Sequence, residues 1–318
     1  TPMLRSLVGS EMCIRDRSLG ALLVDAFGWQ AVFFINVPVA GIVIILGPRW
    51  VPESVSDSIP HKVDLISVPL ASLGVGIAIL AITQGDKWGW SSLNLILSFA
   101  IASLLVTAFV IRSQRHKAPL FDLNLFKLKT FSVGMIGTVF FMVAFFSWLI
   151  SLPTFIQSVW GWSVLKTGFA IAPAPLLTAF VSPPAGRLAE RIGNGPILTI
   201  GGLLGATGLT LHLIFTNTQP DYFMGIFVPG ILLGFAAGFG FAQLIGAAMR
   251  DVPRDQFGMA GAGRTTIFQL ALALGVALAF TIIGRPASPE AALDGLQTTW
   301  ILGIGCYIAQ TLLFALFG

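Results

Sequence analysis

Long stretches without charge are the feature of this sequence that most limits its possible folds. Nine runs of at least 20 residues contain no Asp, Glu, Lys or Arg. A helix crosses the hydrocarbon core of a bilayer in about 20 residues, and no run alternates as an outer-membrane barrel strand does. We therefore predict an all-α membrane protein with about nine transmembrane helices, in residues 26–48, 65–85, 88–111, 130–165, 167–186, 192–220, 222–249, 265–284 and 295–318.

The composition agrees with this prediction and excludes several classes of protein. Only 10% of the residues are charged, whereas a soluble globular protein carries about 25%. A soluble enzyme, a nucleic-acid-binding protein and a secreted disulfide scaffold are therefore excluded. The two cysteines, Cys13 and Cys306, form no metal-ligand spacing, and we expect no metal and no cofactor.

Residues 1–17 differ from the rest of the chain. They hold five charges and show no helical or strand period, and the composition changes abruptly at Ser18. The segment 12–17 can be written ATG TGT ATA AGA GAC AGR, which resembles a transposon end used in preparing sequencing libraries. We expect residues 1–17 to be a translated artefact, with the native protein beginning upstream of residue 18.

Lys and Arg residues predict the orientation of the spans. The loops alternate between a set with eleven of these residues and a set with three. Because cytoplasmic loops are the basic ones, residues 48–64, 112–129, 187–194 and 250–258 are expected inside, together with the C-terminus. Tryptophans cluster in the opposite turns, where we interpret them as interface anchors. We therefore expect a multi-pass membrane protein with a cytoplasmic C-terminus.

Residues that suggest transport are few. Pro173, Pro175, Pro183 and Pro184 each remove a backbone donor from the span 167–186, and a bendable helix beside a cavity is typical of transporters. No zinc-protease, nucleophile-elbow or phosphate-loop motif occurs, so we predict no catalytic residue and no enzyme. No Asp or Glu lies at mid-membrane in residues 18–318, so a proton-carrying carboxylate is expected either in a part of the protein upstream of residue 18 or not at all.

Two segments resemble one protein family. The stretch GRLAERIGN (186–194) resembles the GxLaDRxGrR loop of the major facilitator superfamily, with Glu190 at the usual Asp and Asn194 in place of a basic residue. Residues 19–44 resemble a signature of its fourteen-spanner drug/proton antiporter branch. The chain departs from that branch at Phe268, where an Arg is common, and this weakens any role carried over to that helix.

The resemblance implies a division of the chain. Residues 18–48 would be a remnant of span five followed by span six, residues 49–111 two extra linker spans with their flanking loop, and residues 112–130 a basic cytoplasmic linker. Residues 131–318 would form the C-terminal six-helix bundle, and spans one to five would be missing. We therefore expect no transport by these 318 residues alone.

The resemblance also implies a site. Spans nine, ten, twelve and thirteen would line a cavity for hydrophobic or cationic drugs, exported in exchange for protons by a protein that we expect to be a monomer. A cytoplasmic latch would hold the cytoplasmic side of the transporter closed. A tight turn between two spans that follows the positive-inside rule is an alternative explanation of the same motif. Cavity candidates are Phe141, Phe145, Trp148, Phe239, Gln243 and Gln269, and the latch motif comprises Gly186, Arg187, Glu190, Arg191 and Gly193.

Two alternatives remain open. One is a membrane protein without transport activity, such as an assembly or signalling subunit, for which the lack of a mid-membrane carboxylate would be natural. The other is a transporter of a different small solute. An enzyme acting on lipid is a weaker third reading, because no enzyme motif is found.

Overall fold

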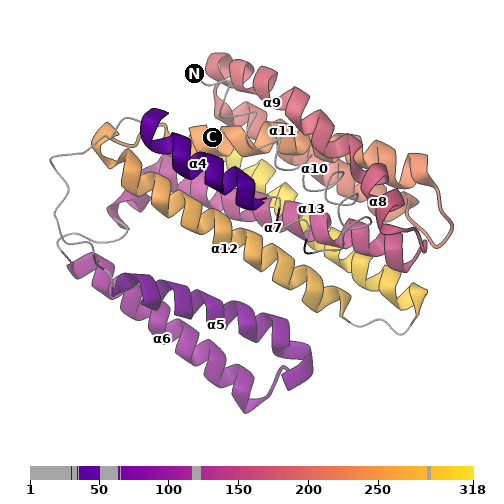
Figure 1. Cartoon of the computed structure of the whole chain (residues 1–318), viewed down its shortest axis with the longest axis horizontal. Coiled ribbons are helices and arrows are strands. Elements are labelled where there is room, and N and C mark those ends of the chain that lie inside the picture. The colour runs from indigo at the N-terminus through magenta and orange to yellow at the C-terminus, as the bar shows by residue number, and fades with distance from the viewer. Residues whose placement is uncertain are drawn as a thin grey trace.

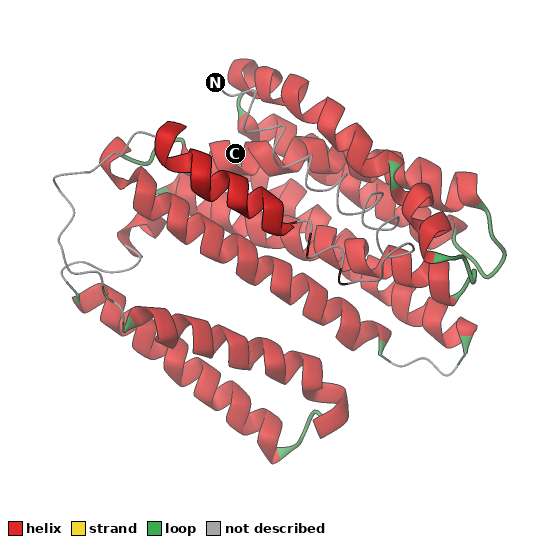
Figure 2. Cartoon of the chain, viewed as in Figure 1, coloured by secondary structure: helices red, strands yellow, loops and turns green. Residues whose placement is uncertain are grey.

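The computed structural model describes residues 30, 34, 36–50, 64, 66–116, 123–284 and 288–318. These residues form helices joined by short turns, with no strand among them (Figure 2). The helices are α4 (Asn36–Trp50), α5 (Ser67–Trp88), α6 (Leu93–Arg115), α7 (Lys129–Ser158), α8 (Val164–Ile171), α9 (Pro173–Ile192), α10 (Asn194–Phe215), α11 (Val228–Met249), α12 (Phe257–Ile283) and α13 (Pro289–Phe317), with the short turns η2 (Leu123–Lys127), η3 (Phe223–Phe227) and η4 (Arg254–Gln256).

Within these residues, eight helical segments are long and apolar enough to cross a membrane. Two of them are composite, because α8 continues into α9 and η3 continues into α11. The all-α membrane fold expected from the charge-free runs is therefore confirmed. The ninth expected span, 26–48, is described mainly in its second half, which belongs to α4, and the greater part of its first half lies outside the described residues.

Helix α7 occupies the middle of the main bundle and packs against α11, α12 and α13 (Figure 1). Helix α10 covers α11 and α13, and α9 lies on the outer side of α11. Small residues allow this close packing. A Cβ atom on Gly134 of α7 would lie 2.7 Å from the Cα of Ala248 in α11, so the two backbones almost touch.

Helices α5 and α6 form a separate hairpin that packs on α12 (Figure 1). Thr281 of α12 donates a hydrogen bond of 3.1 Å to the carbonyl oxygen of Ile82 in α5. The Arg112 guanidinium ties the two helices together by donating to both carboxylate oxygens of Asp64, at 2.8 and 2.8 Å. These bonds, together with the Ser67 hydroxyl at 2.6 Å, hold the pKa of Asp64 well below its usual range.

The bundle has two chemically different ends. Lys129, Asn194, Arg250 and Gly318 line one open cavity of about 300 Å³, and we call this the basic end. The opposite end holds Trp160, Trp162 and Trp300, and we call it the tryptophan end. Helix α7 begins at the basic end and reaches the tryptophan end near Ser158. Described residues of three of the four expected basic loops, namely Lys129, Asn194 and Arg250, thus meet at one end of the bundle.

Candidate functional site

Three of the six expected cavity residues lie on one face of α7. Phe141, Phe145 and Trp148 are four and three residues apart, which places them on the same side of a helix, and all three are buried. Phe141 and Phe145 stack at 5.8 Å, and Phe241 of α11 meets each ring edge-on at 5.2 Å. Tyr307 of α13 lies 6.0 Å from Phe141. This aromatic cluster is a packed core around the middle of α7.

The other three expected cavity residues lie elsewhere. Phe239 packs toward α10, since its Cβ lies 3.0 Å from the position that a Cβ on Gly201 would take. Gln243 is buried, and neither of its amide atoms has a hydrogen-bond partner among the described residues. Gln269 is exposed on α12. The structure therefore brings Phe141, Phe145 and Trp148 together and leaves Phe239 and Gln269 apart from them.

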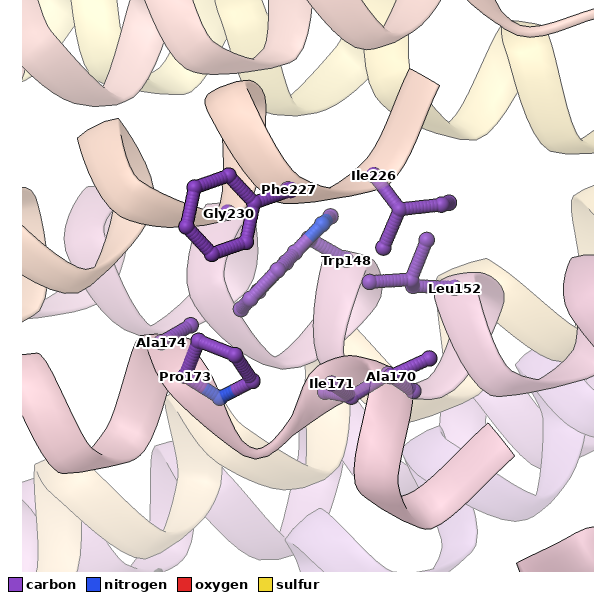
Figure 3. A pocket seen from close by; sticks show the side chains of 9 residues that line it. All are labelled: Trp148, Leu152, Ala170, Ile171, Pro173, Ala174, Ile226, Phe227 and Gly230. Carbon is purple, nitrogen blue, oxygen red and sulfur yellow. The ribbon is translucent and has the colours of Figure 1, made fainter. Parts of the chain in front are cut away.

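A small cavity lies beside Trp148, on the tryptophan side of the aromatic cluster. Its volume is about 10 Å³, which is room for about one water molecule. Figure 3 shows the Trp148 ring at the centre, with Phe227 beside it and Pro173 and Ala174 on another wall. The lining is almost entirely apolar, and its residues are Trp148, Leu152, Ala170, Ile171, Pro173, Ala174, Ile226, Phe227 and Gly230.

One wall of this Trp148 cavity is an interrupted helix. Helix α8 ends at Ile171 and α9 starts at Pro173, so that only Ala172 separates them. Pro173 has no backbone N–H and cannot continue the hydrogen-bond ladder of α8. The ladder resumes when Leu176 donates to the Ala172 carbonyl at 3.3 Å. The proline-rich span is therefore interrupted, as its prolines suggest, and the interruption lies beside a cavity.

A second irregular helix forms the facing wall. The turn η3 is π-helical, because the Val228 N–H bonds to the carbonyl of Phe223, five residues earlier. Pro229 has no N–H to offer the carbonyl of Gly225, and the Thr216 hydroxyl approaches that carbonyl at 3.5 Å instead. Such π-helical turns within α-helices are frequent at functional sites. The Trp148 cavity thus lies between two helices whose ladders are both interrupted.

Two polar groups belong to this cavity wall or bond to it. The Tyr222 hydroxyl donates a hydrogen bond of 3.3 Å to the Ala170 carbonyl and so connects the start of η3 to α8. The indole N–H of Trp148 is buried and has no partner among the described residues. A buried donor without a partner is costly in an apolar site, so Trp148 can offer a hydrogen bond to an incoming acceptor.

The expected latch motif lies at the basic end, where α9 meets α10. Gly193 joins the two helices with φ of +88°, a backbone conformation that residues with a side chain rarely adopt. Arg187, Glu190 and Arg191 are exposed, and none of them forms an ion pair within the described part of the chain. Gly186 has open space around it. The geometry is that of a tight reversal whose charged side chains are available to a partner.

The prediction that the tryptophans are interface anchors is wrong for two of them. Trp300 has 0% exposure and donates to the Ser151 hydroxyl at 2.9 Å. Trp160 has 8% exposure and donates to the Asn217 carbonyl at 2.8 Å. Both side chains satisfy their N–H groups inside the bundle, whereas Trp88 and Trp90 at the hairpin tip are exposed.

Sequence reasoning missed several residues around the cavity. Tyr222, Phe227 and Phe241 received no role. Tyr222 bonds to Ala170 of the cavity wall, Phe227 lines the cavity and Phe241 closes the aromatic cluster. The available signal was weak, since aromatic residues occur throughout the spans.

In the described residues, no group of three His, Cys, Asp or Glu side chains is placed to hold a metal ion.

Comparisons with known proteins agree on one family of membrane transporters. The sequence matches the Major Facilitator Superfamily over residues 17–276. It is 30% identical to the multidrug resistance protein Stp of Mycobacterium tuberculosis, over 84% of this chain and 48% of Stp. It is 26% identical to the probable multidrug resistance protein EmrY of Escherichia coli K12, over 85% and 53% of the two chains. The lincomycin resistance protein LmrB of Listeria monocytogenes is 24% identical, over 86% and 58%. The chain spans about half the length of these relatives.

Proposed function

This chain belongs to the major facilitator superfamily, and from that membership we propose that it takes part in exporting hydrophobic or cationic drugs across the bacterial inner membrane. The names of its relatives Stp and EmrY support drug export. The structural observation that carries the proposal is the Trp148 cavity, which lies between two interrupted helices as substrate sites of transporters do.

The geometry supports a mechanism in which helix ends move against α7. The break at Ala172 and the π-helical turn η3 each lack regular ladder bonds, so bending there costs less than bending an intact helix. At about 10 Å³ the cavity is too small for a drug, and outward movement of α8 would enlarge it. We propose that this movement belongs to an alternating-access cycle in which Trp148 contacts the substrate.

We further propose that the basic end is cytoplasmic. The segregation of Lys and Arg to this end follows the positive-inside rule. In this arrangement residues 131–318 act as the C-terminal bundle, residues 49–111 contribute the linker hairpin and residues 18–48 belong to the end of the first bundle. Residues 112–130 connect hairpin and bundle on the cytoplasmic side.

Coupling to protons and a monomeric state are parts of the same proposal. The charge-free runs contain no carboxylate, so the group that carries protons is expected outside residues 18–318. Glu190 serves as the latch, because an exposed carboxylate at a helix end can pair with a cation or a helix N-terminus of the opposite bundle. Of the other cavity candidates, Phe141, Phe145 and Gln243 would support or line the path beyond Trp148, whereas Phe239 and Gln269 lie apart from it.

Ethidium efflux tests the proposal. Pump-deficient bacteria that express the full-length protein, including the spans expected upstream of residue 18, should expel preloaded ethidium, and an ionophore that collapses the proton gradient should stop the efflux. Trp148→Leu should slow efflux, whereas Trp88→Leu, at an exposed tryptophan of the hairpin, should not. Equal ethidium retention with and without the protein, at confirmed membrane levels, would contradict drug export.

A pair of glutamate variants of the same full-length protein tests the latch. Glu190→Gln should reduce efflux at unchanged membrane levels, because the amide keeps the shape and removes the charge. Glu290→Gln changes a glutamate that is also exposed, at the first turn of α13, and should leave efflux unchanged. Efflux that is unaffected by Glu190→Gln would exclude the latch.

A further inference from the structure

A cation already occupies an aromatic face at the tryptophan end. The ammonium nitrogen of Lys166 lies 3.7 Å from the centroid of the Trp162 ring. Lys166 is exposed, and no carboxylate of the described residues forms an ion pair with it. The electron-rich face of a tryptophan attracts such a cation electrostatically. The Trp162 ring is therefore a cation-binding face that the chain fills with its own side chain.

Further aromatic rings connect this face to the Trp148 cavity. The Tyr222 ring lies 6.3 Å from Trp162, and the Phe227 ring lies 6.1 Å from Tyr222. Phe227 in turn lines the cavity beside Trp148 (Figure 3). Consecutive ring separations of this size let a flat or bulky organic cation remain in contact with one ring while it reaches the next.

The surroundings favour organic cations over other ligands. Aromatic faces attract weakly hydrated cations, whereas a metal ion would lose tightly bound water without gaining an oxygen ligand from the rings. Asp221 lies next to Tyr222 in the chain, and its carboxylate accepts hydrogen bonds from the N–H groups of Phe223 and Met224 at 3.1 and 3.2 Å. A fixed negative charge therefore stands near the path and disfavours anions.

We propose that the Trp162 face is a cation-binding site at the mouth of the Trp148 cavity, occupied at rest by Lys166 and exchanged for an organic monovalent cation. Lys166 acts as a tethered competitor, since its ammonium must leave the ring before a ligand cation can take its place. The place of this site on a transport route rests on the proposed function, whereas the binding and the competition do not.

Equilibrium binding of tetraphenylphosphonium to the purified protein in nanodiscs tests this site. Lys166→Gln should tighten binding about fivefold by removing the competitor, and Lys166→Arg should not, because a guanidinium also binds a ring face. Trp162→Leu should weaken binding about fivefold. Trp88→Leu, at a tryptophan of the α5–α6 hairpin, is the matched control and should leave the affinity unchanged.

Lys166→Gln is the decisive variant, because its side chain is exposed and its loss should not disturb folding. An affinity unchanged by both Lys166→Gln and Trp162→Leu would overturn the proposal. The proposal would also be overturned if the binding of triphenylphosphine oxide, a neutral probe of similar shape, changed in these variants as much as the binding of tetraphenylphosphonium does. If the binding responses appear while cells fail to expel ethidium, the proposed export function fails and the cation site stands. If cells expel ethidium and the binding responses are absent, the cation site alone fails.

Discussion

The hydroxyl of Tyr222 donates a hydrogen bond to the carbonyl of Ala170 and so joins the π-helical turn η3 to α8 beside the Trp148 cavity. This bond spans two segments whose own ladders are interrupted. It is therefore a directional contact that holds these two segments together at the cavity wall.

Removing this bond should loosen the bundle measurably. Tyr222→Phe is expected to lower the free energy of unfolding by about 1 kcal/mol, the usual worth of one hydrogen bond. Tyr307→Phe is the control, because the buried Tyr307 hydroxyl has no partner among the described residues and its loss should be neutral or stabilising. Thermal unfolding in detergent compares the two. Equal destabilisation by both variants would contradict the role of Tyr222.

The bond from Trp300 to Ser151 predicts a second difference. Ser151→Ala leaves the buried Trp300 N–H without its acceptor and should cost about 1–3 kcal/mol of unfolding free energy. Ser147→Ala, one turn earlier on α7, removes only a bond of 3.0 Å to the Ala144 carbonyl of the same helix. Its effect should be clearly smaller in the same unfolding assay, and equal effects would refute this assignment.

Two glycines one turn apart on α11 should respond in opposite ways. A Cβ on Gly234 would lie 2.7 Å from the carbonyl oxygen of Ala174 in α9, so Gly234→Ala should push the helices apart and cost about 1–3 kcal/mol. A Cβ on Gly230 would meet nothing closer than 3.9 Å, and Ala favours a helix over Gly. Gly230→Ala should therefore be neutral or stabilising in chemical denaturation, and the reverse order would contradict the packing.

The ion pair of Asp64 and Arg112 predicts a pH dependence. Because the pKa of Asp64 is lowered in the folded state, its contribution to stability is present above the unfolded pKa of about 3.9 and is lost as the pH falls toward the folded value. Asp64→Asn should thus be less stable than the native protein by the same amount from pH 8 to pH 5. A difference that disappears between pH 7 and pH 5 would exclude this pairing.

The spans could be predicted from the sequence because charge is costly in lipid. The run 192–220 contains α10 (Asn194–Phe215), and the run 65–85 nearly coincides with the apolar part of α5, Ser67–Gly85. Helix existence therefore follows from the positions of a few charges. The exact ends do not, because α12 begins at Phe257 with Arg264 inside the helix, and α13 begins at Pro289 with Glu290 and Asp294 inside it.

The site could be predicted only in part, because helix rotation leaves no trace in an entirely apolar sequence. Helix α11 is apolar on all sides, so the sequence cannot say which face meets α7. Phe241, two residues after the expected Phe239, is the ring that faces Phe141 and Phe145. Glycine contacts between helices set this rotation, and those contacts are visible only in three dimensions.

The most direct test of the account is whether substrate protects the Trp148 cavity. With Cys13 and Cys306 replaced by alanine, Gly230→Cys places a thiol on the cavity wall, and Gly258→Cys places one on the exposed start of α12 as a control. In membranes that contain the protein, ethidium should slow maleimide labelling of Gly230→Cys and leave that of Gly258→Cys unchanged. Labelling rates of Gly230→Cys that are the same with and without ethidium would contradict a drug path through this cavity.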